Sequence, residues 1–274
     1  MKVGTTAWDI KRLLNSSSAT EPSQEISSTP TATLRCRIGA PSIVEAMRPV
    51  ATKDWSLMFN GFGAEGLDFL GRMSSMTTTD FQAHKKDYLT LIAEPAKAFI
   101  SAIVPLLPEA ISPGIEGIPR TNGSIAPINN DRRFSPDKPP YKDHLLFRFW
   151  EGPDKKTAPT LFVRIAPESA GFASGVVFAD VARWRTRIAA DGDGLVLAIA
   201  SLRTNRSAEV VGESLKRTPA PYADDHRHAA LLRHKMFQVR WLATGIDIAA
   251  DGLVEQAAAE LSVAFAVHLW LGAL

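Results

Sequence analysis

The sequence predicts an α+β fold, a single domain in which N- and C-terminal helices flank an antiparallel sheet, preceded by a disordered tail. Apolar residues recur at helical spacing near both ends of the chain, and two short apolar runs bounded by turn residues lie between them. The 274 residues are 45% hydrophobic, enough for a sizeable core. The formal net charge of +2 gives no argument for nucleic acid or a membrane. The single cysteine excludes a disulfide scaffold and favours a reducing compartment.

The first part of the chain differs in composition from the rest. Residues 13–34 are mainly Ser, Thr, Pro and other small or polar types, which cannot bury enough apolar surface to offset the entropy of ordering. We expect residues 1–51 to be a disordered extension and residues 52–274 to be the α+β domain. No apolar run reaches the roughly 20 residues of a membrane span, and charged residues interrupt the N-terminus where a signal peptide is apolar. We therefore expect a cytoplasmic protein that does not contact membranes.

The domain begins with helices. Apolar spacing predicts one helix over residues 64–74 and a second from Asp80 to Pro105, either continuous or restarting at Pro95. Residues 108–142 are rich in proline and glycine and lack periodic apolar positions. They are predicted to be a long irregular segment, which in compact domains is usually functional or disordered.

Strands follow the irregular segment. The runs His144–Trp150 and Thr160–Ile165 enclose Gly152-Pro-Asp-Lys-Lys and are typical of a hairpin, and Gly171–Phe178 is a third strand candidate. Helical spacing returns after Val181, with a break expected at Asp191-Gly-Asp-Gly. We predict two more helices, over Ala229–Trp241 and Leu253–Leu271.

Two motifs favour structural interpretations. Gly61-Phe-Gly63-Ala-Glu-Gly66 matches the dinucleotide pattern G-x-G-x-x-G but lacks a βαβ unit, so a turn before a helix is the favoured reading. Five side chains of metal-ligand type also lie close together in the sequence: Asp224, Asp225, His226, His228 and His234. Three interleaved cations would repel a metal ion, so we expect a solvated polar loop and no metal site.

The main candidate site is the stretch Asp131-Arg-Arg-Phe-Ser-Pro-Asp-Lys-Pro-Pro-Tyr-Lys142, called here the basic loop. Its candidate ligand-binding residues are Arg133, Ser135, Lys138, Tyr141 and Lys142. Arg133 could bind a phosphate or carboxylate with two hydrogen bonds, with the lysines as point charges and Tyr141 as a donor. Asp137 would orient a cation or act as a base. Alternatively, Asp131 and Asp137 pair with these cations and fix the loop to the sheet.

The basic loop resembles the signature R-x-Y-R-D-x-R-F-S-x-D-K-x-P-Y-K of a microbial and fungal family known only as domain of unknown function 2461. The matching residues are Asp131, Arg133, Phe134, Ser135, Asp137, Lys138, Pro140, Tyr141 and Lys142. A second block, Leu215-Lys-Arg217 to His226, resembles the family's L-K-R-x-P-x-G-Y segment, and the resemblance extends from about residue 58 to the C-terminus. It implies a shared fold and site, with Lys216 and Arg217 as further ligand-binding candidates and His226 as a second candidate catalytic group.

The chain departs from the family pattern at several positions. The family's two arginines before the Asp are Pro127 and Asn130 here, the Trp before Phe81 is Asp80, and the Gly of P-x-G-Y is Pro221. The loss of two cations beside the proposed anion site indicates a divergent member with altered or lost activity.

Two functions from different classes remain open. The leading hypothesis is a site for a small anionic molecule in the basic loop, with Asp137 or His226 transferring protons if the protein is an enzyme. The alternative is a non-catalytic module whose basic loop binds nucleic acid or an acidic protein, although the near-neutral net charge disfavours nucleic acid. The sequence identifies no reaction, cofactor or oligomeric state.

Overall fold

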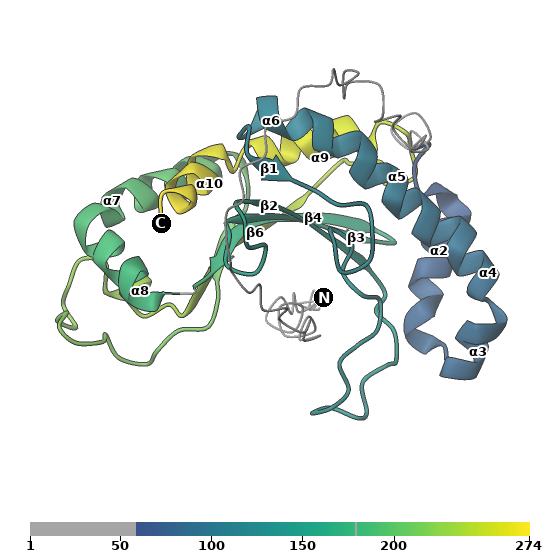
Figure 1. Cartoon of the computed structure of the whole chain (residues 1–274), viewed down its shortest axis with the longest axis horizontal. Coiled ribbons are helices and arrows are strands. Elements are labelled where there is room, and N and C mark those ends of the chain that lie inside the picture. The colour runs from purple at the N-terminus through teal and green to yellow at the C-terminus, as the bar shows by residue number, and fades with distance from the viewer. Residues whose placement is uncertain (1–58, 179) are drawn as a thin grey trace, which may run out of the picture. The chain divides into compact units, whose positions relative to one another are not determined.

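A six-stranded antiparallel sheet is the central element of the computed structural model, which describes residues 59–178 and 180–274 (Figure 1). The spatial order is β1-β2-β3-β4-β6-β5. The strands are β1 (Ile115–Glu116), β2 (Leu145–Glu151), β3 (Thr160–Ala166), β4 (Ser169–Val177), β5 (Glu209–Val211) and β6 (Met236–Ala243). The three strands predicted after residue 143 are confirmed, and they pair as consecutive antiparallel neighbours. The expectations for residues 1–51 lie outside the described residues.

The two faces of the sheet differ in chemistry, because successive side chains of a strand point to opposite sides. Phe147, Val163, Phe172 and Trp241 are cross-strand neighbours on one face, and each is at most 2% exposed. This is the core face. The opposite face, called here the polar face, bears the polar side chains of Arg148, Thr160, Arg164, Gln238 and Arg240. It also carries the buried apolar side chains of Leu146, Trp150 and Phe162.

Helices cover the core face and confirm the predicted α+β class. They are α2 (Gly63–Arg72), α3 (Thr78–Ala83), α4 (Lys85–Tyr88), α5 (Glu94–Ile103), α6 (Leu107–Ala110), α7 (Val181–Asn205), α8 (Ala229–Leu232), α9 (Leu253–Ser262) and α10 (Phe265–Gly272). Helices α9 and α10 contact β4, α5 packs against α9, and α7 packs against α10 (Figure 1). The helices from both ends of the domain therefore share one core with the sheet.

The first N-terminal helix agrees with the sequence prediction, whereas the second, expected from Asp80, is interrupted at His84 between α3 and α4. Helix α2 begins one residue before the expected start, and a π-helical turn, Leu89–Ala93, joins α4 to α5 with Pro95 in the first turn of α5. The segment Lys85–Ala110 is long and apolar enough to cross a membrane by length and composition. Ile92, Phe99 and Ile103 are nevertheless fully buried in the core of the domain, and this packing accounts for their apolar character.

The glycine motif forms a turn before a helix, as expected. Gly61 has a left-handed φ of +84°, and an added Cβ would lie 1.8 Å from the carbonyl oxygen of Ala249. The backbone N–H of Gly63 donates to that same oxygen at 3.3 Å. The glycines thus permit close packing of two backbone segments, and helix α2 starts directly afterwards.

One predicted helix is wrong. The segment Ala229–Trp241 contains only the short α8 before the chain enters β6, which pairs with both β4 and β5. Phe237, Val239 and Trp241 alternate with Gln238 and Arg240, which is the two-residue period of a half-buried strand. The apolar Leu231 and Leu232 precede this alternation and give the segment its apparent helical spacing.

The remaining helix predictions need smaller changes. The expected break in α7 is a kink at Asp191, whose φ and ψ are −142° and 39°. The predicted C-terminal helix is two helices, since the helical pattern is interrupted at Val263 and Ala264 between α9 and α10. Ala264 is fully buried, so the change of direction occurs inside the core.

Candidate functional site

Asn130 closes the basic loop at its base. Its side-chain amide donates to the carbonyl oxygens of Pro139 and Tyr141, each at 3.0 Å, and its backbone N–H donates to that of Pro140 at 2.9 Å. A β-bridge between Asn129 and Tyr141 lies alongside. The residue that replaces a family arginine therefore joins the two arms of the loop.

Hydrogen bonds within the loop also define its tip. Arg132 Nε donates to the carbonyl oxygen of Pro136 at 3.0 Å, and the Ser135 hydroxyl donates to that of Phe134 at 2.7 Å. Arg133 Nη2 lies 2.8 Å from Asp131 Oδ2, and this hydrogen bond raises the pKa of the Arg133 guanidinium. Ser135 and Arg133 thus make local contacts within the loop. The ion pair of Arg133 with Asp131 is of the kind expected if the acidic residues of the loop serve a structural role.

Tyr141 anchors the loop to the helices. Its side chain is 6% exposed and its ring stacks on Phe81 of α3, with centroids 4.3 Å apart. The next residue, Lys142, donates through Nζ to the carbonyl oxygen of Pro127, the other position at which the family has an arginine. Tyr141 is consequently a packing residue, stacked on Phe81 in the core.

The other loop candidates remain near the surface. Asp137 is exposed, and its side chain makes no hydrogen bond or ion pair with the described residues. Lys138 is half-buried, and its backbone N–H donates to the carbonyl oxygen of Ser135 at 3.1 Å. Neither residue has a described neighbour that identifies a catalytic role.

The second block of candidates lies away from the basic loop. Figure 1 shows the loop below the sheet, whereas the chain that leads into α8 lies at the lower left, beneath α7. Lys216 and Arg217 are exposed there, and His226 Nδ1 accepts a hydrogen bond from the backbone N–H of His228 at 3.0 Å. Only Nε2 of His226 remains for proton transfer. Asp137 and His226 therefore do not form one acid–base pair.

The histidines and aspartates of this region do not converge. His228 Nε2 lies 3.1 Å from Asp193 Oδ1, and Asp224 accepts a hydrogen bond from the backbone N–H of Thr218 at 2.9 Å. In residues 59–178 and 180–274, no three His, Cys, Asp or Glu side chains form a group that could hold a metal ion.

A Ser–Glu–His chain elsewhere has the wrong order for a nucleophile. Ser112 Oγ donates to Glu151 Oε1 at 2.5 Å, and His268 Nε2 lies 3.0 Å from Glu151 Oε2. An activated serine requires the base beside its hydroxyl. Here the Glu151 carboxylate lies between Ser112 and His268, so these hydrogen bonds fasten α10 to β2.

Two buried arginines on the polar face were missed by sequence reasoning. Arg148 is 6% exposed and donates to the carbonyl oxygens of Gly123 and Asn122 at 2.9 and 3.3 Å. Arg164 is 4% exposed, and its closest acidic contact is Asp143, 3.8 Å from Nη2. The signal was a single cation within each otherwise apolar strand, because such a charge is rarely buried without a partner.

The electrostatics of this face are dominated by cations. Burial lowers the pKa of both Arg148 and Arg164. Burial also lowers the pKa of Lys155, and the nearby charges of Arg148 and Arg120 lower it further. Lys155 Nζ donates to the carbonyl oxygen of Asn122, the same oxygen that Arg148 contacts. Several positive charges therefore gather beside β2.

Two donors on the polar face have no hydrogen-bond partner. Arg164 Nε and Gln238 Nε2 are both buried and unpaired within the described part of the chain. Between Arg164 and Gln238, β4 presents Gly171, Ala173 and Gly175 on this face, so no side chain larger than a methyl group stands between them.

The fold and the polar face define an α+β domain with a basic surface and a basic loop at the edge of its sheet. Residues 65–270 match the family of conserved hypothetical proteins DUF2461, and the chain belongs to this family. A comparison with curated proteins found no match, and neither did a comparison with solved structures.

Proposed function

We propose that this domain binds a small molecule with an oxyanion group, a phosphate or carboxylate, on the polar face next to the basic loop. The observation that supports this most is the unpaired Nε of Arg164. A buried donor left unsatisfied costs about 1–3 kcal/mol, and more when it is charged. An oxyanion would accept hydrogen bonds from Nε and from a terminal nitrogen of the same guanidinium.

The surrounding charges support an anion rather than a neutral group. Arg148, Lys155 and Arg120 contribute positive potential, and the described residues provide no ion pair for any of them. Like charges held close together repel one another. A bound anion would offset that repulsion.

The distance between the two unpaired donors suggests a molecule larger than a bare ion. Arg164 lies on β3 and Gln238 on β6, with β4 between them. Two strand spacings amount to about 10 Å, and the register adds about 13 Å along β4, because Arg164 is paired with Gly171 and Gln238 with Gly175. A ligand with an oxyanion at Arg164 and a hydrogen-bond acceptor at Gln238 would lie across the small residues of β4.

The predicted residues of the basic loop have different roles in this proposal. Lys138 and Lys142 add positive charge at the border of the site, whereas Arg133 and Ser135 maintain the shape of the loop. Asp137 is the candidate proton-transfer group for this site, and His226, Lys216 and Arg217 lie outside it. The lone cysteine supports the cytoplasm as the location.

Native and denaturing mass spectrometry on freshly purified protein test the proposal. The native spectrum should show an excess mass that is absent after denaturation. The Arg164→Met variant should lose it, because methionine fills similar space without donors. Arg240→Met is the matched control, since Arg240 lies on the same face but is paired with Glu209 at 2.7 Å. The proposal fails if Arg164→Met retains the excess mass, or if the native protein neither carries one nor is stabilised by phosphate or citrate.

Phe134 favours the alternative function, a non-catalytic interaction module. Its side chain is 85% exposed at the tip of the basic loop, with the Arg133 guanidinium 6.0 Å from its ring. Exposed aromatic and basic side chains together are typical of surfaces that stack on nucleic-acid bases or bind acidic partners. Single-stranded RNA or DNA binding that weakens steeply with salt and is lost in Phe134→Ala would support this alternative.

A further inference from the structure

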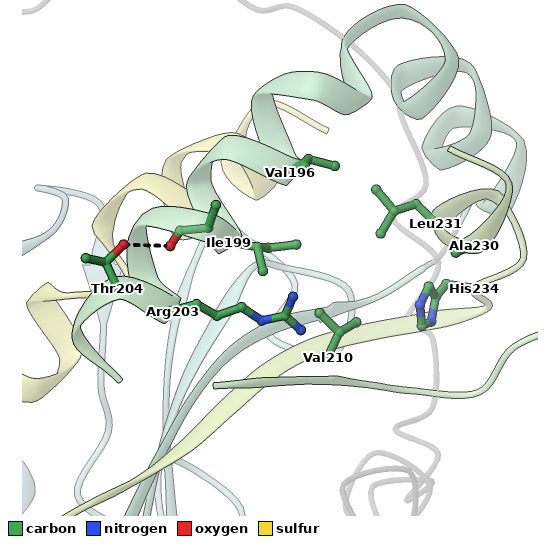
Figure 2. Close-up of a pocket in the computed structure, with 9 residues that line it drawn as sticks. Val196, Ile199, Arg203, Thr204, Val210, Ala230, Leu231 and His234 are labelled. Atoms are coloured by element: carbon green, nitrogen blue, oxygen red, sulfur yellow. Dashed lines mark hydrogen bonds between the residues drawn. The ribbon is translucent and has the colours of Figure 1, made fainter. Parts of the chain in front are cut away.

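A second site lies between α7, β5 and α8, away from the polar face. It is a pocket of about 690 Å³, lined by apolar side chains that include Ile199 of α7, Val210 of β5 and Leu231 of α8 (Figure 2). Small-molecule sites usually have volumes of about 300–1,000 Å³ and mainly apolar walls. Val196, at the edge of this pocket, is 45% exposed, so apolar surface remains uncovered there.

Three polar side chains border the apolar walls. Arg203, in the last turn of α7, donates through Nε to the carbonyl oxygen of Ala208 at 3.1 Å. Its terminal nitrogens have no partner among the residues that the structure describes. His234 Nδ1 lies 3.2 Å from the carbonyl oxygen of Met236, and this contact leaves Nε2 for a ligand. The Thr204 hydroxyl donates to the carbonyl oxygen of Ala200 at 3.1 Å, so it is already occupied (Figure 2).

We infer that this pocket binds an amphiphilic monoanion, an aliphatic carboxylate whose chain lies over Ile199, Val210 and Leu231 and whose head group pairs with Arg203. Charge complementarity selects this class, because Arg203 is the permanently charged side chain in a mainly apolar lining. The planar guanidinium matches a carboxylate with two parallel hydrogen bonds. The pocket includes none of the polar-face residues, so the inference does not depend on the proposed function.

Competition against a fluorescent apolar probe tests this inference. N-phenyl-1-naphthylamine would report occupancy of the pocket, and octanoate and 1-octanol would compete as ligands that differ only in the charged head group. We expect octanoate to displace the probe from the native protein at about tenfold lower concentration than octanol. In Arg203→Met the preference for octanoate should be lost, because an unpaired carboxylate is costly to desolvate, while displacement by octanol stays the same. Arg183→Met is the matched control, since Arg183 is exposed near the start of the same helix.

Further variants keep the test decisive. Arg203→Lys retains the charge without the planar guanidinium and should show an intermediate preference. Arg203→Gln repeats the neutral substitution if Arg203→Met does not fold. The inference is overturned if the native protein gives no saturable probe signal, if octanoate and octanol compete equally, or if the preference persists in Arg203→Met. A probe signal that disappears as protein concentration rises would show that a second copy of the chain covers the pocket, and would also overturn it.

Discussion

The Arg133 guanidinium forms hydrogen bonds with both carboxylate oxygens of Asp131, with Nε 3.0 Å from Oδ1 and Nη2 2.8 Å from Oδ2. The backbone N–H of Arg133 also donates to Oδ1 at 3.1 Å. The cation that sequence reasoning placed at the centre of an anion site is therefore satisfied within its own loop, whereas Nε of Arg164, on β3, has no hydrogen-bond partner among the described residues.

This difference predicts opposite results for two arginine variants. Arg133→Ala should keep the ligand affinity of the native protein within about twofold, because Arg133 already has an acidic partner. Its melting temperature should change little, since the Arg133 side chain is 67% exposed. A titration of each variant with the copurified ligand measures the effect. Complete loss of binding in Arg133→Ala at unchanged melting temperature would mean that the anion site is at the tip of the basic loop and not at Arg164.

The two aromatic residues of the basic loop should differ in their contribution to stability. Tyr141→Ala should lower the free energy of unfolding by about 3 kcal/mol, because it leaves a cavity beside Phe81. Phe134→Ala should change it by less than about 0.5 kcal/mol, since Phe134 is exposed. Urea unfolding of both variants checks the prediction. Equal effects would mean that Tyr141 does not anchor the loop.

The glycine motif gives a matched pair of substitutions. Gly61 and Gly63 both have left-handed backbones, with φ of +84° and +63°, but only at Gly61 would an added Cβ clash with another backbone segment. Gly63→Ala should cost about 1–2 kcal/mol, from the left-handed conformation alone. Gly61→Ala adds a clash with Ala249 and should cost more than about 3 kcal/mol. Thermal or urea unfolding would contradict this if Gly63→Ala were the more damaging change.

Stability should fall on mild acidification. Burial lowers the pKa of His144, His234 and His268, so between those pKa values and the ordinary value of about 6.5 the unfolded chain binds more protons. The melting temperature should be level above about pH 7 and decrease as the pH falls below about 6.5. His268→Gln should flatten this decrease. A melting temperature that rises between about pH 7.5 and about pH 5.5 would contradict the assignment of neutral buried histidines.

The sequence predicted the elements whose periodicity is undisturbed. The β2–β3 hairpin, helix α2 and the break in α7 at Asp191 follow directly from apolar spacing and turn residues. The strand β6 was mistaken for a helix because Leu231 and Leu232 come just before its alternating residues. Its place between β4 and β5 depends on long-range pairing, which local spacing does not contain.

The candidate site was only partly predictable, for a related reason. The basic loop is a local cluster of charges and is visible as such in the sequence. Arg148, Arg164 and Gln238 are far apart in the chain and reach one face only when β2, β3 and β6 join the sheet. Whether a loop cation is already paired, as Arg133 is with Asp131, is likewise visible only in three dimensions.

Thermal unfolding in phosphate tests the central claim most directly. Melting temperatures of the native protein, Arg164→Met and Arg133→Ala would be compared in phosphate and in chloride at equal ionic strength. A ligand that binds only the folded state raises stability, by about 2.7 kcal/mol at a hundredfold excess over its dissociation constant. We predict a phosphate-specific rise in the native protein and in Arg133→Ala, and none in Arg164→Met. An equal rise in all three proteins, or its loss in Arg133→Ala alone, would contradict a site at Arg164.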